Sequence, residues 1–331
     1  CYQLRKFMKQ HITRAYNSFA IDSALGTIAK KSQESRLRNE INYYKEIARV
    51  DPKSALFFPR LLSSQETVEG FSMELEYYAY DNLGDYMVYK DFDSKFWSSV
   101  AESLVNARSQ FSRTKVLPSK SNIAEAMYVE KTEHYYQDLV RNFEKFTMMS
   151  QQQSLMIDGE RCLNFESLWS SIKHLIDVHL TPLGEVSIIH GDFCFSNILC
   201  GINQKTDTTI LKFVDPRGNF GVDGVFGDPN YDAAKLVHSY QGGYEYIIYD
   251  QFDIEEDLSR NVYNIVFSND NKNKISEIFR EETDLYSLKS KLIEGLIYIG
   301  MCSRHYDSEK RQTAMYLNGI KILNRVLRGE V

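Results

Sequence analysis

The sequence has few cysteines and no long hydrophobic run, and each absence excludes a class of protein. Five cysteines occur among 331 residues, an odd number, and none forms a C-x-x-C pair. This pattern disfavours a disulfide framework or a structural zinc site and favours reduced thiols in the cytoplasm. No apolar run approaches the roughly 20 residues that a membrane span requires. The opening residues also lack a signal-peptide pattern.

An excess of positive charge is missing as well. The formal net charge is −6, which argues against a nucleic-acid partner, because such proteins usually carry a basic face. The net charge of a whole chain says little about the charge of one pocket. A net charge of −6 is compatible with a neutral or cationic small substrate. The chain is long enough for one large domain or two lobes. It begins with Cys1 rather than Met, as expected of an excised piece of a longer protein.

The most informative stretch is residues 187–218. Apolar residues 198–200 and 210–214 are separated by a polar, turn-like segment, which predicts two short strands joined by a hairpin. Asp192, Asn197 and Asp215 then lie at strand ends or in the loop between them. Short oxygen-bearing side chains of this kind suit Mg²⁺. An inert hydrogen-bonded turn is the main alternative, and a transition-metal site lacks a second histidine nearby.

The pattern His-Gly-Asp-x-x-x-x-Asn from His190 to Asn197, followed by Asp215 after an apolar strand, resembles the aminoglycoside phosphotransferase and choline kinase family. That family has a two-lobed, protein-kinase-like α+β fold. The resemblance implies a small antiparallel β N-lobe that binds nucleotide, at residues 1–80. It implies a mostly helical C-lobe with the catalytic loop and the acceptor site, at residues 81–331.

The resemblance also implies ATP and Mg²⁺ as cofactors and a hydroxyl group as phosphoryl acceptor. Asp192 would orient or deprotonate that hydroxyl, with His190 supporting the loop. Asn197 and Asp215 would hold Mg²⁺. Asp232, which ends a Gly-Asp-Pro-x-Tyr-Asp segment, would buttress the loop from below. Asp-Pro-Arg-Gly stands where protein kinases have Asp-Phe-Gly, and its proline disfavours flipping of this segment.

A β-hairpin is expected over residues 14–31, although no G-x-G-x-x-G motif occurs there, and residues 17–18 are a weak candidate for a turn over phosphate. Ala29-Lys30-Lys31 resembles the kinase strand whose lysine reaches the phosphates. Alternation along a strand puts Ala29 and Lys31 on one face, which favours Lys31 over Lys30. Two solvated lysines on an edge strand are the alternative.

Helical periodicity covers residues 35–50, where Glu40 borders the apolar stripe. In the family resembled, such a glutamate holds the strand lysine, so Glu40 is expected to pair with Lys31. The strand at residues 70–77 would run into the hinge that pairs with adenine, with Met73, Glu74 and Leu75 as hinge candidates. Further helices are predicted at residues 94–111, 122–149 and 164–179.

The acceptor is the part of the function that the sequence defines least. Arg217 is expected to bind an anionic acceptor or a phosphate, and an internal salt bridge is the alternative. The Asp-Pro-Arg-Gly variant is similar to a bacterial subgroup linked to capsule and surface-polysaccharide synthesis, sometimes joined to a nucleotidyltransferase. This implies a sugar, polyol or amino alcohol as acceptor.

Other functions remain open at this point. An aminoglycoside phosphotransferase would need an acidic acceptor cleft, and a choline kinase an aromatic cage. A nucleotide-binding scaffold without catalysis is a further alternative. The three residues Asp192, Asn197 and Asp215 argue against a scaffold, because such proteins commonly lose a metal ligand.

Overall fold

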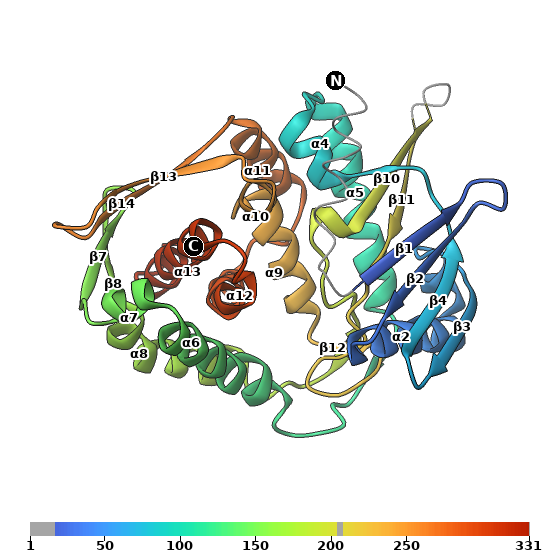
Figure 1. Ribbon diagram of the computed structural model, residues 1–331, viewed down its shortest axis with the longest axis horizontal. Coiled ribbons are helices and arrows are strands. Elements are labelled where there is room, and N and C mark those ends of the chain that lie inside the picture. The colour runs from blue at the N-terminus through green and yellow to red at the C-terminus, as the bar shows by residue number, and fades with distance from the viewer. Residues whose placement is uncertain (1–16, 204–207, 331) are drawn as a thin grey trace.

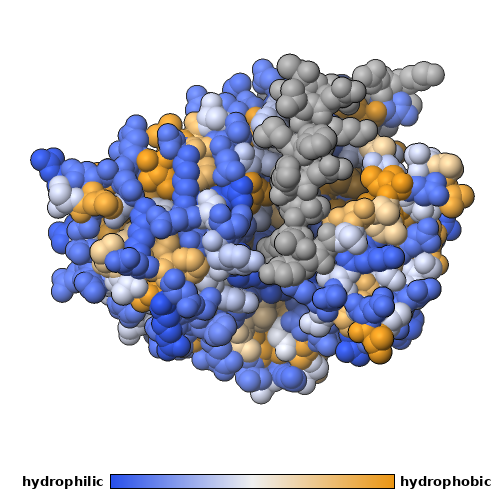
Figure 2. Space-filling model, viewed as in Figure 1, coloured by the Kyte–Doolittle hydropathy of each residue, from blue (hydrophilic) through white to orange (hydrophobic). Residues whose placement is uncertain are grey.

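The computed structural model describes residues 17–203 and 208–330 of the 331-residue chain. An antiparallel sheet with an adjoining helix, drawn in blue in Figure 1, lies beside a larger and mostly helical part. Hydrophilic residues predominate on the face shown in Figure 2, with hydrophobic residues scattered among them. None of the helices in the described residues combines the length and the hydrophobicity that a bilayer crossing needs.

Four antiparallel strands form the N-terminal sheet in the order β1-β2-β4-β3. Their bounds are β1 Asn17–Asp22, β2 Thr27–Ser32, β3 Leu61–Thr67 and β4 Gly70–Glu76. The expected hairpin is confirmed in the described residues, while residues 14–16 lie outside them. The phosphate turn expected at residues 17–18 is wrong, because β1 begins there. The chain turns instead at residues 23–26, where the Asp22 carboxylate accepts two backbone N–H groups.

Helix α2 (Ser35–Val50) packs against β3 and β4 and has the expected bounds. Its buried face includes Leu37, Ile41 and Ile47 at helical spacing, and Glu40 is buried on the same side. Burial of a carboxylate requires a partner, so this position already indicates an ion pair. The short helix α3 (Pro52–Ala55) follows, capped by Asp51.

The larger part is built mainly of helices, with α12 in contact with α6, α9 and α13. The helices are α4 Leu83–Tyr89, α5 Ser94–Phe111, a π-helix Glu125–Glu130, α6 Lys131–Asn142, α7 Glu144–Ser150, α8 Phe165–His179, α9 Pro229–Tyr240, α10 Tyr244–Ile248, α11 Asn271–Glu282, α12 Leu288–Cys302 and α13 Glu309–Leu327. The helices predicted at 94–111 and 164–179 are confirmed. The single helix predicted at 122–149 is wrong, because Phe143 is extended and separates α6 from α7.

Sequence reasoning missed a second four-stranded sheet at the edge of the helical part, drawn in orange and green in Figure 1. It contains β7 Ser154–Ile157, β8 Glu160–Leu163, β13 Phe252–Asp257 and β14 Val262–Phe267, in the order β13-β14-β7-β8. The strands are short, and the parallel pairing of β14 with β7 joins segments far apart in the chain. Neither property leaves a strong local pattern.

Two small sheets position the stretch that carries the polar motif. Their strands are β5 Asp81–Asn82, β6 Lys115–Val116, β9 Val186–Ile188, β10 Ile198–Asn203, β11 Thr208–Phe213 and β12 Phe226–Gly227, in the orders β11-β10-β5 and β12-β9-β6. The predicted hairpin of β10 and β11 is confirmed in the described residues. Buried Ile188, Phe193 and Phe213 belong to the same core cluster as Leu37 and Ile41 of α2. The strand ends are therefore packed firmly against the N-terminal part.

Candidate active site

Residues 190–197 form a loop between β9 and β10 that Asp232 holds from α9. The Asp232 carboxylate accepts the backbone N–H of His190 at 2.6 Å and that of Gly191 at 2.8 Å. Gly191 has a positive φ of 80°, and a Cβ there would lie 2.8 Å from the Cβ of Arg217. A larger residue would therefore push the loop away from the segment that follows β11. The geometry expected of Asp232 is present.

The imidazole of His190 is buried between the rings of Phe58 and Phe193, with centroids 6.0 and 5.4 Å away. Its Nδ1 accepts the backbone N–H of Asp192 at 3.2 Å, so the proton is on Nε2, which donates to the Val214 carbonyl at 3.0 Å. Burial lowers the pKa of His190 to about 4. The ring is neutral near pH 7 and links the loop to the end of β11.

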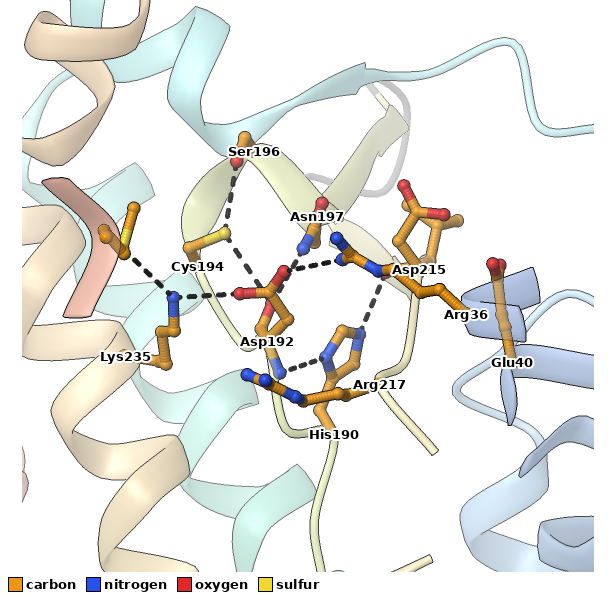
Figure 3. Close-up of polar contacts among 12 residues, drawn as sticks. Arg36, Glu40, His190, Asp192, Cys194, Ser196, Asn197, Asp215, Arg217 and Lys235 are labelled. Carbon is orange, nitrogen blue, oxygen red and sulfur yellow. Dashed lines mark hydrogen bonds and ion pairs between the residues drawn. The ribbon is translucent and has the colours of Figure 1, made fainter. Parts of the chain in front are cut away.

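The Asp192 carboxylate lies between two cations from different helices. Lys235 of α9 approaches Oδ1 to 2.9 Å, and Arg36 of α2 approaches Oδ2 to 3.4 Å. Figure 3 shows these two side chains reaching Asp192 from opposite sides. Burial alone would raise the pKa of Asp192, but Lys235 and Arg36 hold it well below its usual range. The carboxylate is therefore ionised near neutral pH.

Asn197 and Asp215 lie next to each other at the end of the β10–β11 hairpin. The Asn197 amide nitrogen donates to the backbone carbonyl of Asp192 at 2.8 Å, which leaves the amide oxygen as a possible ligand. The backbone N–H of Val214 donates to the Asn197 carbonyl at 3.0 Å, and Asp215 follows with a positive φ of 58°. Because of this left-handed conformation, the Asp215 side chain does not continue the alternation of side chains along β11.

The ammonium group of Lys30 joins the sheet to this turn. Lys30 contacts Glu40 Oε2 at 2.6 Å and also the Asp215 carboxylate. Burial by itself would lower the pKa of Lys30, but Asp215 and Glu40 raise it, so Lys30 stays protonated. The pairing predicted for Lys31 is wrong by one residue, since Lys31 is exposed. Lys30 shares the inner face of β2 with Ile28, which packs against the core.

The predicted hinge residues lie inside a strand and not in the connection that follows it. Met73, Glu74 and Leu75 belong to β4, which pairs with β2 on one edge and β3 on the other. Their backbone groups are committed to the sheet and are not offered to a nucleotide. The Glu74 carboxylate accepts the Thr27 hydroxyl at 2.9 Å. Residues 77–80, which follow β4, are the connection to the helical part.

Arg217 extends from the loop after β11 toward α9. Its backbone N–H donates to the His190 carbonyl at 2.8 Å, and its Nη1 lies 3.4 Å from the Tyr231 hydroxyl. Within residues 17–203 and 208–330, Arg217 makes no ion pair, so the internal salt bridge considered as an alternative does not form there.

A cavity of about 260 Å³ opens beside Asp192. Five basic side chains line it, which we call the basic cluster: Arg36, Lys131, Arg217, Lys235 and Arg304. Among the described residues of the lining, Asp192 is the one carboxylate. Side chains from α12, including Leu296 and Ile297, supply an apolar wall, and Tyr231 and Tyr244 add aromatic surface. This volume is slightly below the range of about 300 to 1,000 Å³ that is typical of small-molecule sites.

Sequence reasoning missed the cations around Asp192, although two of them carried a signal. Lys235 interrupts an apolar segment of α9 that is buried on every side, so it required an anionic partner. Arg36 sits in the first turn of α2, where the helix dipole disfavours a positive charge. Lys131 had no such signal, because it lies in a polar stretch of sequence.

Comparison with known proteins supports the fold and does not assign a family. No protein-family model matches the chain, and no curated protein sequence does. A solved structure of the GDP complex of an aminoglycoside 2'-phosphotransferase mutant matches with a TM-score of 0.51 and 13% identity, over 96% of this chain and 90% of that one. This chain has a protein-kinase-like fold. At this identity the likeness extends to the fold alone.

Two other solved structures align less closely. An aminoglycoside-3'-phosphotransferase of type VIII gives a TM-score of 0.39 and 11% identity over 97% of each chain. A protein described as a fructosamine-3-kinase of Haemophilus somnus 129PT gives 0.48 and 12%, over 94% of this chain and 88% of that one. The kinase-like α+β fold expected from the motif, with an antiparallel sheet at the N-terminal end and a mostly helical remainder, is confirmed.

Proposed function

We propose that this chain is a small-molecule kinase that transfers the terminal phosphoryl group of ATP, with Mg²⁺, to a hydroxyl group. One observation carries the proposal: a single loop presents Asp192 and Asn197 beside Asp215, and Asp215 meets Lys30 of the sheet. The nucleotide would lie between a lobe of residues 1–80 and a lobe of residues 81–331. Its adenine would pair with the backbone at residues 77–80.

The residues at the end of the hairpin fit a magnesium ion. The Asn197 amide oxygen and the Asp215 carboxylate are the hard oxygen ligands that Mg²⁺ prefers, and phosphate oxygens and water would complete its shell. The Asp215 side chain is 44% exposed and so accessible to an ion. Lys30 is shared by two carboxylates, those of Glu40 and Asp215. A bound Mg²⁺ would offset the charge of the phosphates.

Asp192 would orient the acceptor hydroxyl. The hydroxyl oxygen forms a bond to the γ-phosphorus, the bond from that phosphorus to the β–γ bridging oxygen breaks, and the hydroxyl proton passes to Asp192. A carboxylate with a pKa held so low is a weak base, so the proton moves late, as suits a loose transition state. Lys30 would bind the phosphates, and His190 and Asp232 would hold the loop.

For the acceptor we propose a sugar, polyol or amino alcohol used in bacterial capsule or surface-polysaccharide synthesis, with a fused or associated nucleotidyltransferase as partner. The Asp-Pro-Arg-Gly resemblance supports this. A cytoplasmic setting is supported by Cys162, Cys194, Cys200 and Cys302, which are free thiols buried in the fold. The basic cluster disfavours aminoglycosides and choline, because both are cations.

Acceptor-dependent turnover tests the proposal. The protein is incubated with MgATP and a panel of sugars, polyols and amino alcohols, and mass spectrometry is used to detect addition of one phosphoryl group. Asp192→Asn should abolish most product, whereas Asp91→Asn, at a side chain 85% exposed, should not. ATP binding without phosphorylation of any member of a broad panel would favour a nucleotide-binding scaffold.

A further inference from the structure

The basic cluster concentrates positive charge in a chain whose net charge is −6. Lys235 and Arg36 are accounted for, because they pair with Asp192. The remaining three side chains of the cluster have no role in the steps described above. They come from separate segments: the start of α6, the loop after β11, and the turn after α12.

Lys131 and Arg217 meet at Tyr231. The Lys131 ammonium lies 5.7 Å from the centre of the Tyr231 ring, and Arg217 Nη1 lies 3.4 Å from its hydroxyl. Among the described residues no carboxylate forms an ion pair with either side chain. Two cations gathered on one neutral ring, inside a cavity, repel each other and lose hydration.

Arg304 lines the same cavity. Its guanidinium lies 5.9 Å from the centre of the Tyr135 ring, on the same cavity wall as Lys131. Burial, and then the nearby Arg217, Arg304 and Lys235, lower the pKa of Lys131 well below its usual range. An anion placed among these groups would relieve the repulsion and raise the pKa of Lys131 again.

We propose that the acceptor is a small hydroxylated anion, whose phosphate or carboxylate group is bound by Lys131 and Arg217 while its hydroxyl group reaches Asp192. This inference rests on the proposed function and narrows its acceptor class. Arg217 suits a two-oxygen group, since its guanidinium donates in a planar fork. The apolar wall from α12 and the volume of about 260 Å³ suit a ligand of monosaccharide size.

The basic cluster must be distinguished from a nucleotide site. Arg36 and Lys235 touch Asp192, so they are close to where the transferred phosphoryl group would lie. Among the described residues, neither Lys131 nor Arg217 forms a hydrogen bond or an ion pair with Asp192, and both contact Tyr231 instead. Substitution of Lys131 or Arg217 should therefore weaken the acceptor and leave the nucleotide unaffected.

Steady-state kinetics with matched acceptors test this. A neutral sugar, its monophosphate and its uronic acid share hydroxyl groups and differ in the anionic group. We expect one of the two anions to exceed the neutral sugar in kcat/KM by about 10- to 100-fold, and the better anion identifies phosphate or carboxylate. Equal or better turnover of the neutral sugar would overturn the inference while leaving the kinase proposal intact.

Variants locate the binding group. Lys131→Gln and Arg217→Gln should raise the KM of the anionic acceptor by about 10-fold or more, with kcat/KM for the neutral sugar and the Kd for nucleotide nearly unchanged. Lys131→Arg should retain anion preference. Lys274→Gln and Arg260→Gln, at side chains 68% and 80% exposed, are the controls. An equal loss of nucleotide affinity in the cluster variants would assign these residues to the nucleotide instead.

Calorimetry without nucleotide separates the two proposals. Titration of the sugar monophosphate and the uronic acid into the full chain measures anion binding even if no acceptor is phosphorylated. Binding of either that is lost in Lys131→Gln supports the anion site. If neither the sugar monophosphate nor the uronic acid binds to protein whose melting temperature shows that it is folded, the anion site is contradicted, whatever the outcome of the kinase assay.

Discussion

The two sides of the Asp192 loop differ in the sign of their charge. Toward the sheet, one ammonium group, that of Lys30, is shared by the carboxylates of Glu40 and Asp215. Toward α6 and α12, the basic cluster surrounds a cavity whose lining has one carboxylate, that of Asp192 itself. The first side therefore suits an added cation, and the second an added anion.

This difference teaches that net charge describes neither half of the site. A net charge of −6 is compatible with a cationic substrate. The cavity beside Asp192, however, is lined mainly by basic side chains among its charged residues. Each substitution below changes one side of this loop, or the loop itself, and leaves the rest of the site intact.

The largest effect is expected at Asp192, where the two sides meet. Asp192→Asn should lower kcat by about 10²- to 10⁴-fold, because the acceptor hydroxyl loses its charged partner. Nucleotide binding should change little. The check is kcat and KM for both substrates, with Asp91→Asn as control. A normal kcat in Asp192→Asn would remove this residue from the mechanism.

Asp215→Ala removes the exposed carboxylate of the sheet side. The Mg²⁺ concentration that gives half-maximal activity should rise by at least about 100-fold, because loss of even an indirect metal contact commonly costs 10- to 100-fold. Titration of Mg²⁺ at fixed nucleotide measures it. An unchanged Mg²⁺ requirement would mean that the metal is held elsewhere.

Lys30 and Lys31 give a direct contrast between neighbouring lysines. Lys30→Met should lower kcat/KM for nucleotide by about 10- to 100-fold, since a charge-assisted contact to phosphate is lost and Glu40 stays buried without a partner. Lys31→Met should be within about twofold of wild type, because Lys31 is exposed. The reverse order of the two effects would restore the assignment made from the sequence.

The smallest effect concerns the stability of the loop below neutral pH. In the unfolded chain His190 binds a proton below about pH 6.5, whereas in the folded chain its pKa is about 4. The unfolded state therefore binds more protons between these values, and stability falls as the pH falls. Between pH 6.5 and 5 the loss is about 2 kcal/mol.

Chemical denaturation at several pH values measures this loss. A His190→Asn variant lacks the titrating ring, so its stability should fall less over the same interval, and the difference between the two proteins isolates His190 from other groups. Parallel pH profiles for wild type and variant would show that His190 is not the group responsible.

The sequence predicted the positions of site residues correctly where the motif and the strands that flank it are contiguous in the chain. The loop from His190 to Asn197 and the hairpin before Asp215 lie within one short stretch, so spacing alone brings their side chains together. The capping segment with Asp232 follows closely. Helices α2, α5 and α8 also followed from their apolar periods, which survive folding because each buries one face.

Side-chain direction and sheet position were harder to read. Lys30 and Lys31 differ only in the face of β2 on which they lie, and that face depends on how α2 packs against the sheet. Met73, Glu74 and Leu75 were taken as a hinge because the sequence does not reveal that β4 has neighbours on both edges. The lysine error is of one position, because a shift of one residue along a strand changes the face, whereas the hinge error placed the connection inside β4 rather than at residues 77–80.

The sequence by itself determined the loop from His190 to Asn197, the oxygen-bearing side chains at its ends and the helical character of the C-terminal part, because these depend on contacts between residues near in the chain. Only the tertiary structure decided which lysine pairs with Glu40 and that five basic side chains surround one cavity. Those side chains come from α2, α6, the loop after β11, α9 and the turn after α12. No local sequence pattern predicts that these five side chains lie together, since their proximity arises from the packing of segments that are distant in sequence.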